Sequence, residues 1–204
     1  MTKSVRHLVM LSLLGVFAGP VASLAGPPTD QIKATVDNAL GLLRESRQNT
    51  VATQDRRDQL RQILFTRFDF SEMARRALGA HWRRRTATEQ QEFVQLFTEL
   101  LERQYAGIIE SYTDEKIVYV SERTDGAFAE VNSKIFTAKG QELSINYKAQ
   151  LVGQDWKVYD VIAEEISLVN NFRSQFNRVI SSSSYEELVR RLREKQADVI
   201  PVKN

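Results

Sequence analysis

The sequence predicts an α+β fold, in which a four-stranded antiparallel meander sheet is packed on one face by long helices, with an apolar slot between them. Three observations support this fold class. Apolar residues recur at helical spacing through the first half of the chain, alternate with polar residues from Leu143 to Leu151, and return to helical spacing after Ser167. A run of helices, then strands, then helices is typical of helices segregated against one sheet.

The first 25 residues are expected to be a secretory signal peptide. Lys3 and Arg6 precede an apolar run over residues 8–18, and small residues lead to a cleavage site after Ala25. The run is too short for a stable membrane span, although an uncleaved anchor is the alternative. Residues 26–204 are then expected to form a single domain, which suits their number.

The composition excludes several classes of function. Without Lys3 and Arg6, the exported chain has 26 basic and 26 acidic side chains, so a nucleic-acid partner is not expected. The absence of cysteine removes disulfides, thiol nucleophiles and cysteine metal sites. The glycines form no phosphate-binding loop.

Four helices are expected before the sheet. The first spans residues 29–47, with Asp30 as a possible N-cap, and the next two span residues 54–66 and 70–80. The fourth is long and begins with two overlapping capping boxes, Thr86 with Glu89 and Thr88 with Gln91. Its apolar stripe consists of Phe93, Leu96, Phe97, Leu100, Leu101, Tyr105, Ile108, Ile109 and Tyr112.

The period then changes from helix to strand. Strands are expected at residues 116–122, 127–137, 143–151 and 156–163, and the first two flank a hairpin signal, Thr124-Asp125-Gly126. Short polar turns between them predict an antiparallel meander with one apolar face. Helices over residues 167–180 and 184–197 complete the chain.

Few side chains offer catalytic chemistry. His81 is the one histidine outside the signal peptide and is interpreted as a surface or helix-end residue rather than a catalyst or metal ligand. Asp160, Glu164 and Glu165 could form an acid/base pair, as in small cone-shaped isomerases and hydratases. The alternative is structural, with Asp160 holding a neighbouring backbone or arginine and the glutamates at a helix N-terminus.

Two clusters of arginine stand out. The larger contains Arg75, Arg76, Arg83, Arg84 and Arg85, and the smaller contains Arg190, Arg191 and Arg193. Both are interpreted first as solvated helix faces, and the larger alternatively as a patch for an acidic partner or lipid phosphates.

The segment from Trp156 to Phe176, WKVYDVIAEEISLVNNFRSQF, resembles the signature of the MlaC/toluene-tolerance family of periplasmic phospholipid-binding proteins. The segments Phe68-Asp69-Phe70-Ser71-Glu72-Met73-Ala74 and Tyr185-Glu186-Glu187-Leu188 are also similar to that family, and the resemblance extends from Gln31 to Lys195. One departure is Glu165, where many relatives place glycine, so a turn with positive φ would be strained there.

The resemblance implies a periplasmic carrier of phospholipid with no enzyme activity and no cofactor other than this cargo. Its implied partners are an inner-membrane ABC transporter with an MlaD-like domain and an outer-membrane lipoprotein complex, and we expect a monomer. A carrier of another apolar lipid such as a hopanoid, a cone-fold enzyme and a structural adaptor are the alternatives.

The predicted lipid contacts are the inward faces of the last two strands and of two helices. They are Phe93, Phe97, Leu101, Tyr105, Ile108, Leu143, Ile145, Tyr147, Leu151, Trp156, Val158, Leu168, Val169, Phe172 and Phe176. Tyr105, Tyr147 and Arg173 are expected at the mouth, near the lipid head group. We predict no catalytic or metal-binding residue.

Overall fold

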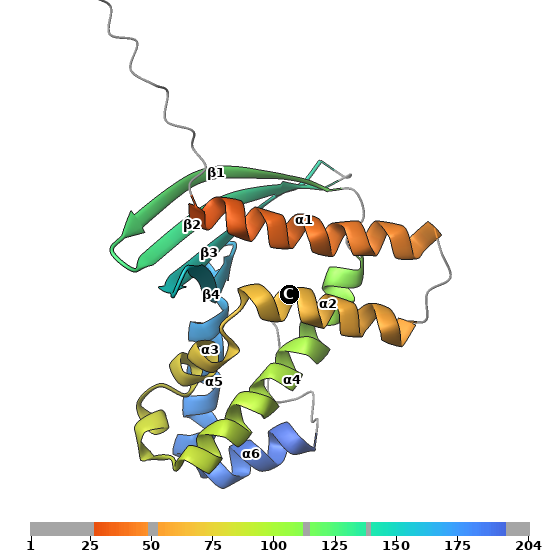
Figure 1. Ribbon diagram of the computed structural model, residues 1–204. Helices are drawn as coiled ribbons and strands as arrows, with labels where there is room; N and C mark the ends of the chain where they lie inside the picture. Colours follow the sequence, from red (N-terminus) through yellow and green to blue (C-terminus); the bar gives the residue numbers. More distant parts are fainter. Residues whose placement is uncertain (1–26, 49–52, 112–114, 138–139, 195–204) are drawn as a thin grey trace, which may run out of the picture.

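The computed structural model describes residues 27–48, 53–111, 115–137 and 140–194, so the predicted signal peptide lies outside the described residues (Figure 1). The helices are α1 (Pro27–Gln48), α2 (Thr53–Arg67), α3 (Phe70–Leu78), the 3-10 helix η1 (Gly79–Arg84), α4 (Ala87–Ser111), α5 (Leu168–Ser182) and α6 (Tyr185–Arg193). The strands are β1 (Lys116–Asp125), β2 (Phe128–Phe136), β3 (Glu142–Val152), β4 (Asp155–Ala163) and β5 (Ile166–Ser167). None of the helices in these ranges combines the length and apolarity needed to cross a membrane.

The α+β fold class is confirmed, but the sheet has five strands rather than four. Its order is β1-β2-β3-β4-β5, with each pair of neighbours antiparallel. The additional strand β5 forms because the chain reverses at Glu164 and Glu165, with φ of 46° and 66°. Glu165 therefore adopts the positive φ that strains a residue other than glycine. Glu164 fixes the turn, because its carboxylate accepts a hydrogen bond from the Ser144 amide at 2.5 Å.

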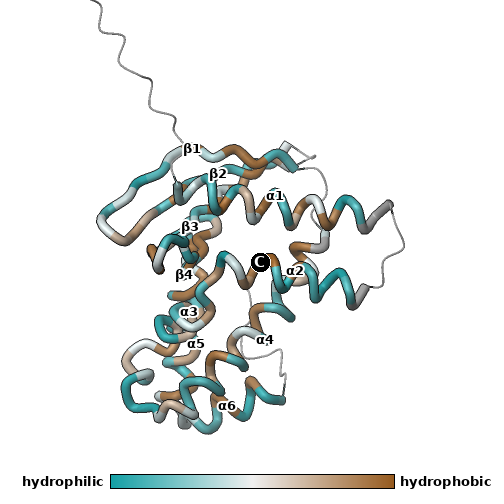
Figure 2. Tube along the Cα trace, viewed as in Figure 1, coloured by the Kyte–Doolittle hydropathy of each residue, from teal (hydrophilic) through white to brown (hydrophobic). Residues whose placement is uncertain are grey.

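The helix covering the sheet is α1, not the long helix α4. Figure 1 shows α1 running along the sheet with α2 beside it, while α3, α4, α5 and α6 form a second body below. Hydrophilic residues colour much of α2 in Figure 2, as expected for a helix with one side in solvent. The interpretation that the apolar stripe of α4 faces the sheet is therefore wrong, since α4 packs mainly against α3 and α6.

Side-chain caps explain where several helices begin. Asp69 caps α3 by accepting from the Glu72 amide at 2.9 Å, and Ser167 caps α5 by accepting from the Asn170 amide at 3.1 Å. Of the two predicted capping boxes, the one between Thr86 and Glu89 forms, with hydrogen bonds of 2.6 and 3.3 Å. Thr88 already lies in the first turn of α4.

The N-terminus of α1 has a different anchor from the predicted one. Because α1 begins at Pro27, Asp30 lies in its first turn rather than at the N-cap. The Glu122 carboxylate of β1 instead accepts hydrogen bonds from the amide of Thr29 at 2.9 Å and from its hydroxyl at 2.6 Å. A negative charge there is favourable because the amides at a helix N-terminus carry partial positive charge.

The core divides into three clusters of apolar side chains. The helical cluster joins α3, α4, α5 and α6, and several of its ring pairs pack edge to face, with 5.1 Å between the centres of Phe97 and Phe172. The sheet cluster joins Ile32 of α1 to residues of β2, β3 and β4. The hairpin cluster joins Ala39 and Leu43 of α1 to Leu60 of α2, with Ile109 of α4 against them.

Candidate functional site

The predicted lipid-contact residues lie in three separate places: the helical cluster, the sheet cluster and the exposed surface. More than half belong to the helical cluster, namely Phe93, Phe97, Leu101, Tyr105, Leu168, Val169, Phe172 and Phe176. Phe93, Phe97 and Phe176 have no solvent-accessible surface, so they border no open space in this structure. These rings form a filled core rather than the wall of a slot.

The other predicted residues lie on the sheet or in solvent. Ile145, Tyr147, Trp156 and Val158 belong to the sheet cluster. Ile108, Leu143 and Leu151 are exposed, and Ile108 has 65% of its surface accessible. The structure therefore does not bring the predicted set together as a single lining.

The inner face of the sheet is the face that α1 covers, and its burial changes along the strands. One row places Ala129, Ala149 and Val158 side by side, and all three are buried beneath α1. Two further rows lie on the same face, because strand residues two apart share a face, and apart from buried Ser133 their side chains are partly or largely accessible. These rows contain Tyr119, Ser133, Ile145 and Ala163 in one, and Ile117, Ile135 and Leu143 in the other.

We call Ile117, Tyr119, Ile135, Leu143, Ile145 and Val161 the inner stripe. Each keeps some accessible surface, up to 38% at Leu143, although each is apolar or aromatic and lies on the helix-covered side of the sheet. Above the stripe, Ala39 and Leu43 of α1 pack with α2 and α4 rather than into the sheet cluster. Tyr119, Ile145 and Val161 pack against the sheet cluster, so this part of the stripe lies at the margin of the covered face.

Sequence reasoning missed four members of the inner stripe: Ile117, Tyr119, Ile135 and Val161. The signal was present, since Ile117 and Tyr119 are two apart on β1 and the meander pairs them with Ile135 and Ser133. The prediction was limited to the last two long strands because the alternation there is the clearest.

Polar residues hold α1 and α2 against the end of β4. Gln31 accepts hydrogen bonds from the Trp156 amide at 2.9 Å and from the Arg67 guanidinium at 2.6 Å. Arg67 also donates to the Trp156 carbonyl at 2.8 Å. Burial lowers the pKa of Arg67, and the nearby charge of Asp155 opposes that shift. This network fixes one end of the helical cover above the sheet.

One buried polar group on the inner face, the hydroxyl of Ser133, has a hydrogen-bond partner. The hydroxyl of buried Ser133 donates to the Ile145 carbonyl at 2.5 Å. Burial raises the pKa of Tyr147 to about 12, and a hydrogen bond with Ser133 opposes that shift. Tyr147 therefore stays neutral at physiological pH.

The acidic residues of the signature segment have structural surroundings. Buried Asp160 accepts hydrogen bonds from the Ser167 hydroxyl at 2.6 Å and from the Val169 amide at 3.0 Å, so it fixes the start of α5. His81 lies 3.0 Å from the Asn177 side chain at the end of a helix. Within the described ranges, no group of three or more potential ligands could hold a metal ion.

The three predicted mouth residues do not lie together. Tyr147 is buried in the sheet cluster, and Tyr105 packs at the margin of the helical cluster. Arg173 is exposed on α5, where its Nε donates to the Arg76 carbonyl at 2.8 Å. Arg173 lines an arginine-rich pocket of about 450 Å³, adjacent to a second pocket of about 320 Å³ beside Trp82.

Comparisons with known proteins agree with this architecture. One similar solved structure is that of a phospholipid-binding protein from Ralstonia solanacearum in complex with a phospholipid, with a TM-score of 0.75 and 26% identity. The match covers 83% of this chain and 97% of that one.

Two curated proteins are similar in sequence. Toluene tolerance protein ttg2D of Pseudomonas putida is 27% identical over 85% of this chain and 81% of its own. The intermembrane phospholipid transport system binding protein MlaC of Haemophilus influenzae is 23% identical, and the match spans 61% of each protein. The family model described as MlaC protein matches residues 33–194, which is most of the chain. This chain belongs to the MlaC family.

Proposed function

We propose that this protein binds a phospholipid by its acyl chains and carries it across the periplasm between the two membranes. The observation that supports this most directly is the inner stripe, a set of apolar side chains that face the helical cover yet remain partly accessible. An unfilled apolar surface inside a fold is the feature that an acyl chain would complete.

The energetics require such a surface. Each methylene group removed from water contributes about 0.8 kcal/mol. Transferring two acyl tails with roughly 30 methylenes from an apolar environment into water therefore costs on the order of 20–25 kcal/mol. A carrier must offer a comparable apolar surface with no unpaired polar group. At Ser133 that second condition is met, because its hydroxyl donates to the Ile145 carbonyl.

We propose a lining that differs from the predicted one. Ile145 and Leu143 remain in it, joined by Ile117, Tyr119, Ile135 and Val161 of the inner stripe. Phe93, Phe97 and Phe176 are instead core residues that pack α4 and α5 together and take no part in the lining. Ile109, near the C-terminus of α4, packs against α1 and α2. This contact joins the helical body to the two helices that cover the sheet.

The setting of this transport is also a proposal. The signal peptide over residues 1–25 would deliver the chain to the periplasm. Its partners would be an inner-membrane ABC transporter with an MlaD-like domain and an outer-membrane lipoprotein complex. The H. influenzae and P. putida relatives support this by their names, which refer to intermembrane phospholipid transport and to toluene tolerance.

Native mass spectrometry of the purified protein, followed by lipid extraction, tests the proposal. We expect a bound species whose mass equals one or more diacyl phospholipids. A polycyclic lipid would support a hopanoid carrier instead. Protein that is folded, lipid-free after purification and unable to take up phospholipid from vesicles would overturn the proposal.

A further inference from the structure

A second site lies in the helical body, in the arginine-lined pocket of about 450 Å³. We propose that this pocket binds the phosphate group of an anionic phospholipid at a membrane surface, and so docks the protein on the bilayer. This site is distinct from the inner stripe and does not depend on which lipid fills it.

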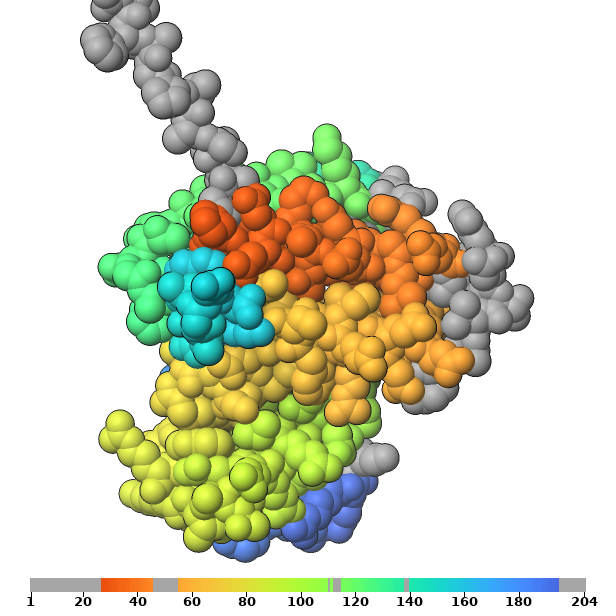
Figure 3. All heavy atoms as spheres, in the orientation of Figure 1, coloured from red at the N-terminus to blue at the C-terminus, as the bar shows by residue number. Residues whose placement is uncertain are grey.

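The pocket is assembled from three elements that are distant in sequence. Its walls are Arg75, Arg76, Gly79, Ala80, Trp82, Arg83 and Arg173, from α3, η1 and α5. In Figure 1 this region lies at the lower left, where α3 leads through η1 toward α4, away from the β1–β2 hairpin. The yellow residues at the lower left of Figure 3 show the same part of the surface.

The charge of the pocket is strongly positive. Four arginines line it, and within the described chain its lining includes no carboxylate. Glu72 lies next to it and neutralises one charge, because its carboxylate pairs with Arg75 at 2.5 Å and with Arg76 at 2.7 Å. Arg76 is further held by the ring of Tyr159, 3.9 Å from the guanidinium carbon.

Two guanidinium groups remain available for a ligand. Arg83 has no hydrogen-bond or ion-pair partner among the residues that the structure describes. Arg173 uses only its Nε, which donates to the Arg76 carbonyl, and its terminal nitrogens are left for another acceptor. A phosphate group with several oxygens suits planar guanidinium donors, which bind it in bidentate fashion.

The side chain of Arg173 packs beside Gly79 at the end of α3. The φ of Gly79 is +58°, and a Cβ there would meet the Arg173 side chain at 3.5 Å. The positive φ favours glycine there, and the stem of Arg173 lies across the end of α3, where it lines the same pocket as Arg76 and Arg83. The convergence of these arginines is therefore built by packing between α3 and α5.

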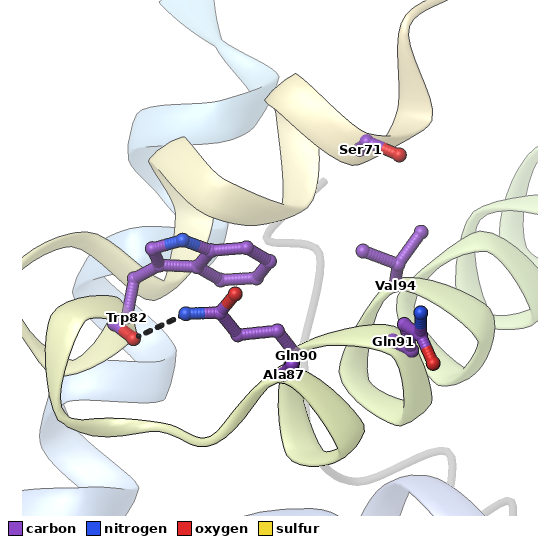
Figure 4. Close-up of a pocket in the computed structure, with 6 residues that line it drawn as sticks. All are labelled: Ser71, Trp82, Ala87, Gln90, Gln91 and Val94. Carbon is purple, nitrogen blue, oxygen red and sulfur yellow. Dashed lines mark hydrogen bonds between the residues drawn. The ribbon is translucent and has the colours of Figure 1, made fainter.

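Trp82 favours a lipid over a free anion or an acidic protein segment. It lines both this pocket and the neighbouring pocket of about 320 Å³, whose other walls include Ser71, Gln90 and Val94. Figure 4 shows the indole extending toward Val94, while the side-chain amide of Gln90 donates a hydrogen bond to the Trp82 carbonyl. Tryptophan beside arginine suits the bilayer interface, where the ring meets apolar groups and the cations meet phosphates.

Sedimentation with phospholipid vesicles tests this proposal on the full mature chain. We expect binding to phosphatidylglycerol-containing vesicles that falls with salt, and little binding to vesicles of phosphatidylcholine alone. Arg83→Gln should weaken the phosphatidylglycerol interaction about fivefold, because one cation near an anionic surface contributes about that factor. Arg173→Gln should do the same, and Arg123→Gln, at an exposed site on β1, should have no effect.

Two further measurements distinguish the outcomes. Arg83→Gln should keep the lipid that co-purifies with the protein, so loss of vesicle binding alone points to the pocket, and absence of any cargo points to failure of the proposed carrier function. Tight binding of inorganic phosphate with no binding to phosphatidylglycerol vesicles would overturn the membrane assignment. Equal vesicle binding by the parent, Arg83→Gln and Arg123→Gln would overturn the site itself.

Discussion

Leu143→Asp places a carboxylate in the inner stripe and should separate lipid binding from folding. In the lipid-free protein 38% of Leu143 is accessible, so the new carboxylate can reach water and the variant should lose about 1 kcal/mol of stability. With an acyl chain in place that carboxylate must lose its water, which costs several kcal/mol. A penalty of about 3 kcal/mol corresponds to affinity reduced by more than a hundredfold.

Asn146→Asp provides the matched control, because it adds the same charge to the same strand on the opposite face, where Asn146 lies beside Asn132 and Ile162. Each protein is freed of lipid, refolded and titrated with a fluorescent phospholipid, and its melting temperature is measured. We expect Leu143→Asp to melt about 2–4 °C lower and to bind the phospholipid more than a hundredfold more weakly, and Asn146→Asp to bind normally. Normal binding by Leu143→Asp would show that the inner stripe does not hold the tails.

Other side chains give independent tests. Phe97→Ala should cost about 3–5 kcal/mol in chemical denaturation, because the ring has no accessible surface and packs against Phe172; loss of lipid with unchanged stability would mean that Phe97 lines the slot after all. Tyr147, with a pKa of about 12 in the fold, should stabilise the protein fully below pH 10 and lose that contribution as pH rises from 10 to 12. Tyr147→Phe should reduce this loss in alkaline unfolding curves, and identical curves would contradict the burial of the hydroxyl. Asp160→Asn should lower stability by about 1–3 kcal/mol and leave co-purified lipid unchanged; loss of lipid from a fully stable variant would give Asp160 a binding role. Glu165→Gly should raise the unfolding free energy by roughly 1 kcal/mol, since φ is 66° there, and a lower melting temperature would show that the glutamate side chain compensates for its backbone.

Local structure was largely predictable from the sequence. The capping box at Thr86 and Glu89 and the alternation after Leu143 identify α4 and β3, because both signals arise from neighbours within a few residues. The positive φ at Glu165 could be expected from the family resemblance.

The partner of each apolar face could not be predicted in the same way. Periodicity shows that Phe93 and Phe97 share one face of a helix, but both a sheet and other helices offer an apolar surface to it. The structure places that face against α3, α5 and α6, and the smaller stripe of α1, with Ile32 and Val36, covers the sheet. The sequence showed the arginines of the pocket that are close together in the chain, such as Arg75 and Arg83. It could not show that Arg173 joins them, because that depends on how α3 and α5 pack.

The attachment of α1 has a consequence for the order of folding. This helix is the first element of the described chain, yet the groups that hold its first turns, Glu122 and the amide of Trp156, are more than 90 residues downstream. Docking of α1 must therefore wait until β1 and β4 have been made and paired, since contacts so distant in sequence close slowly. Until α1 docks, the apolar face of the sheet is exposed to water. The newly synthesised chain is therefore most prone to aggregation during that interval.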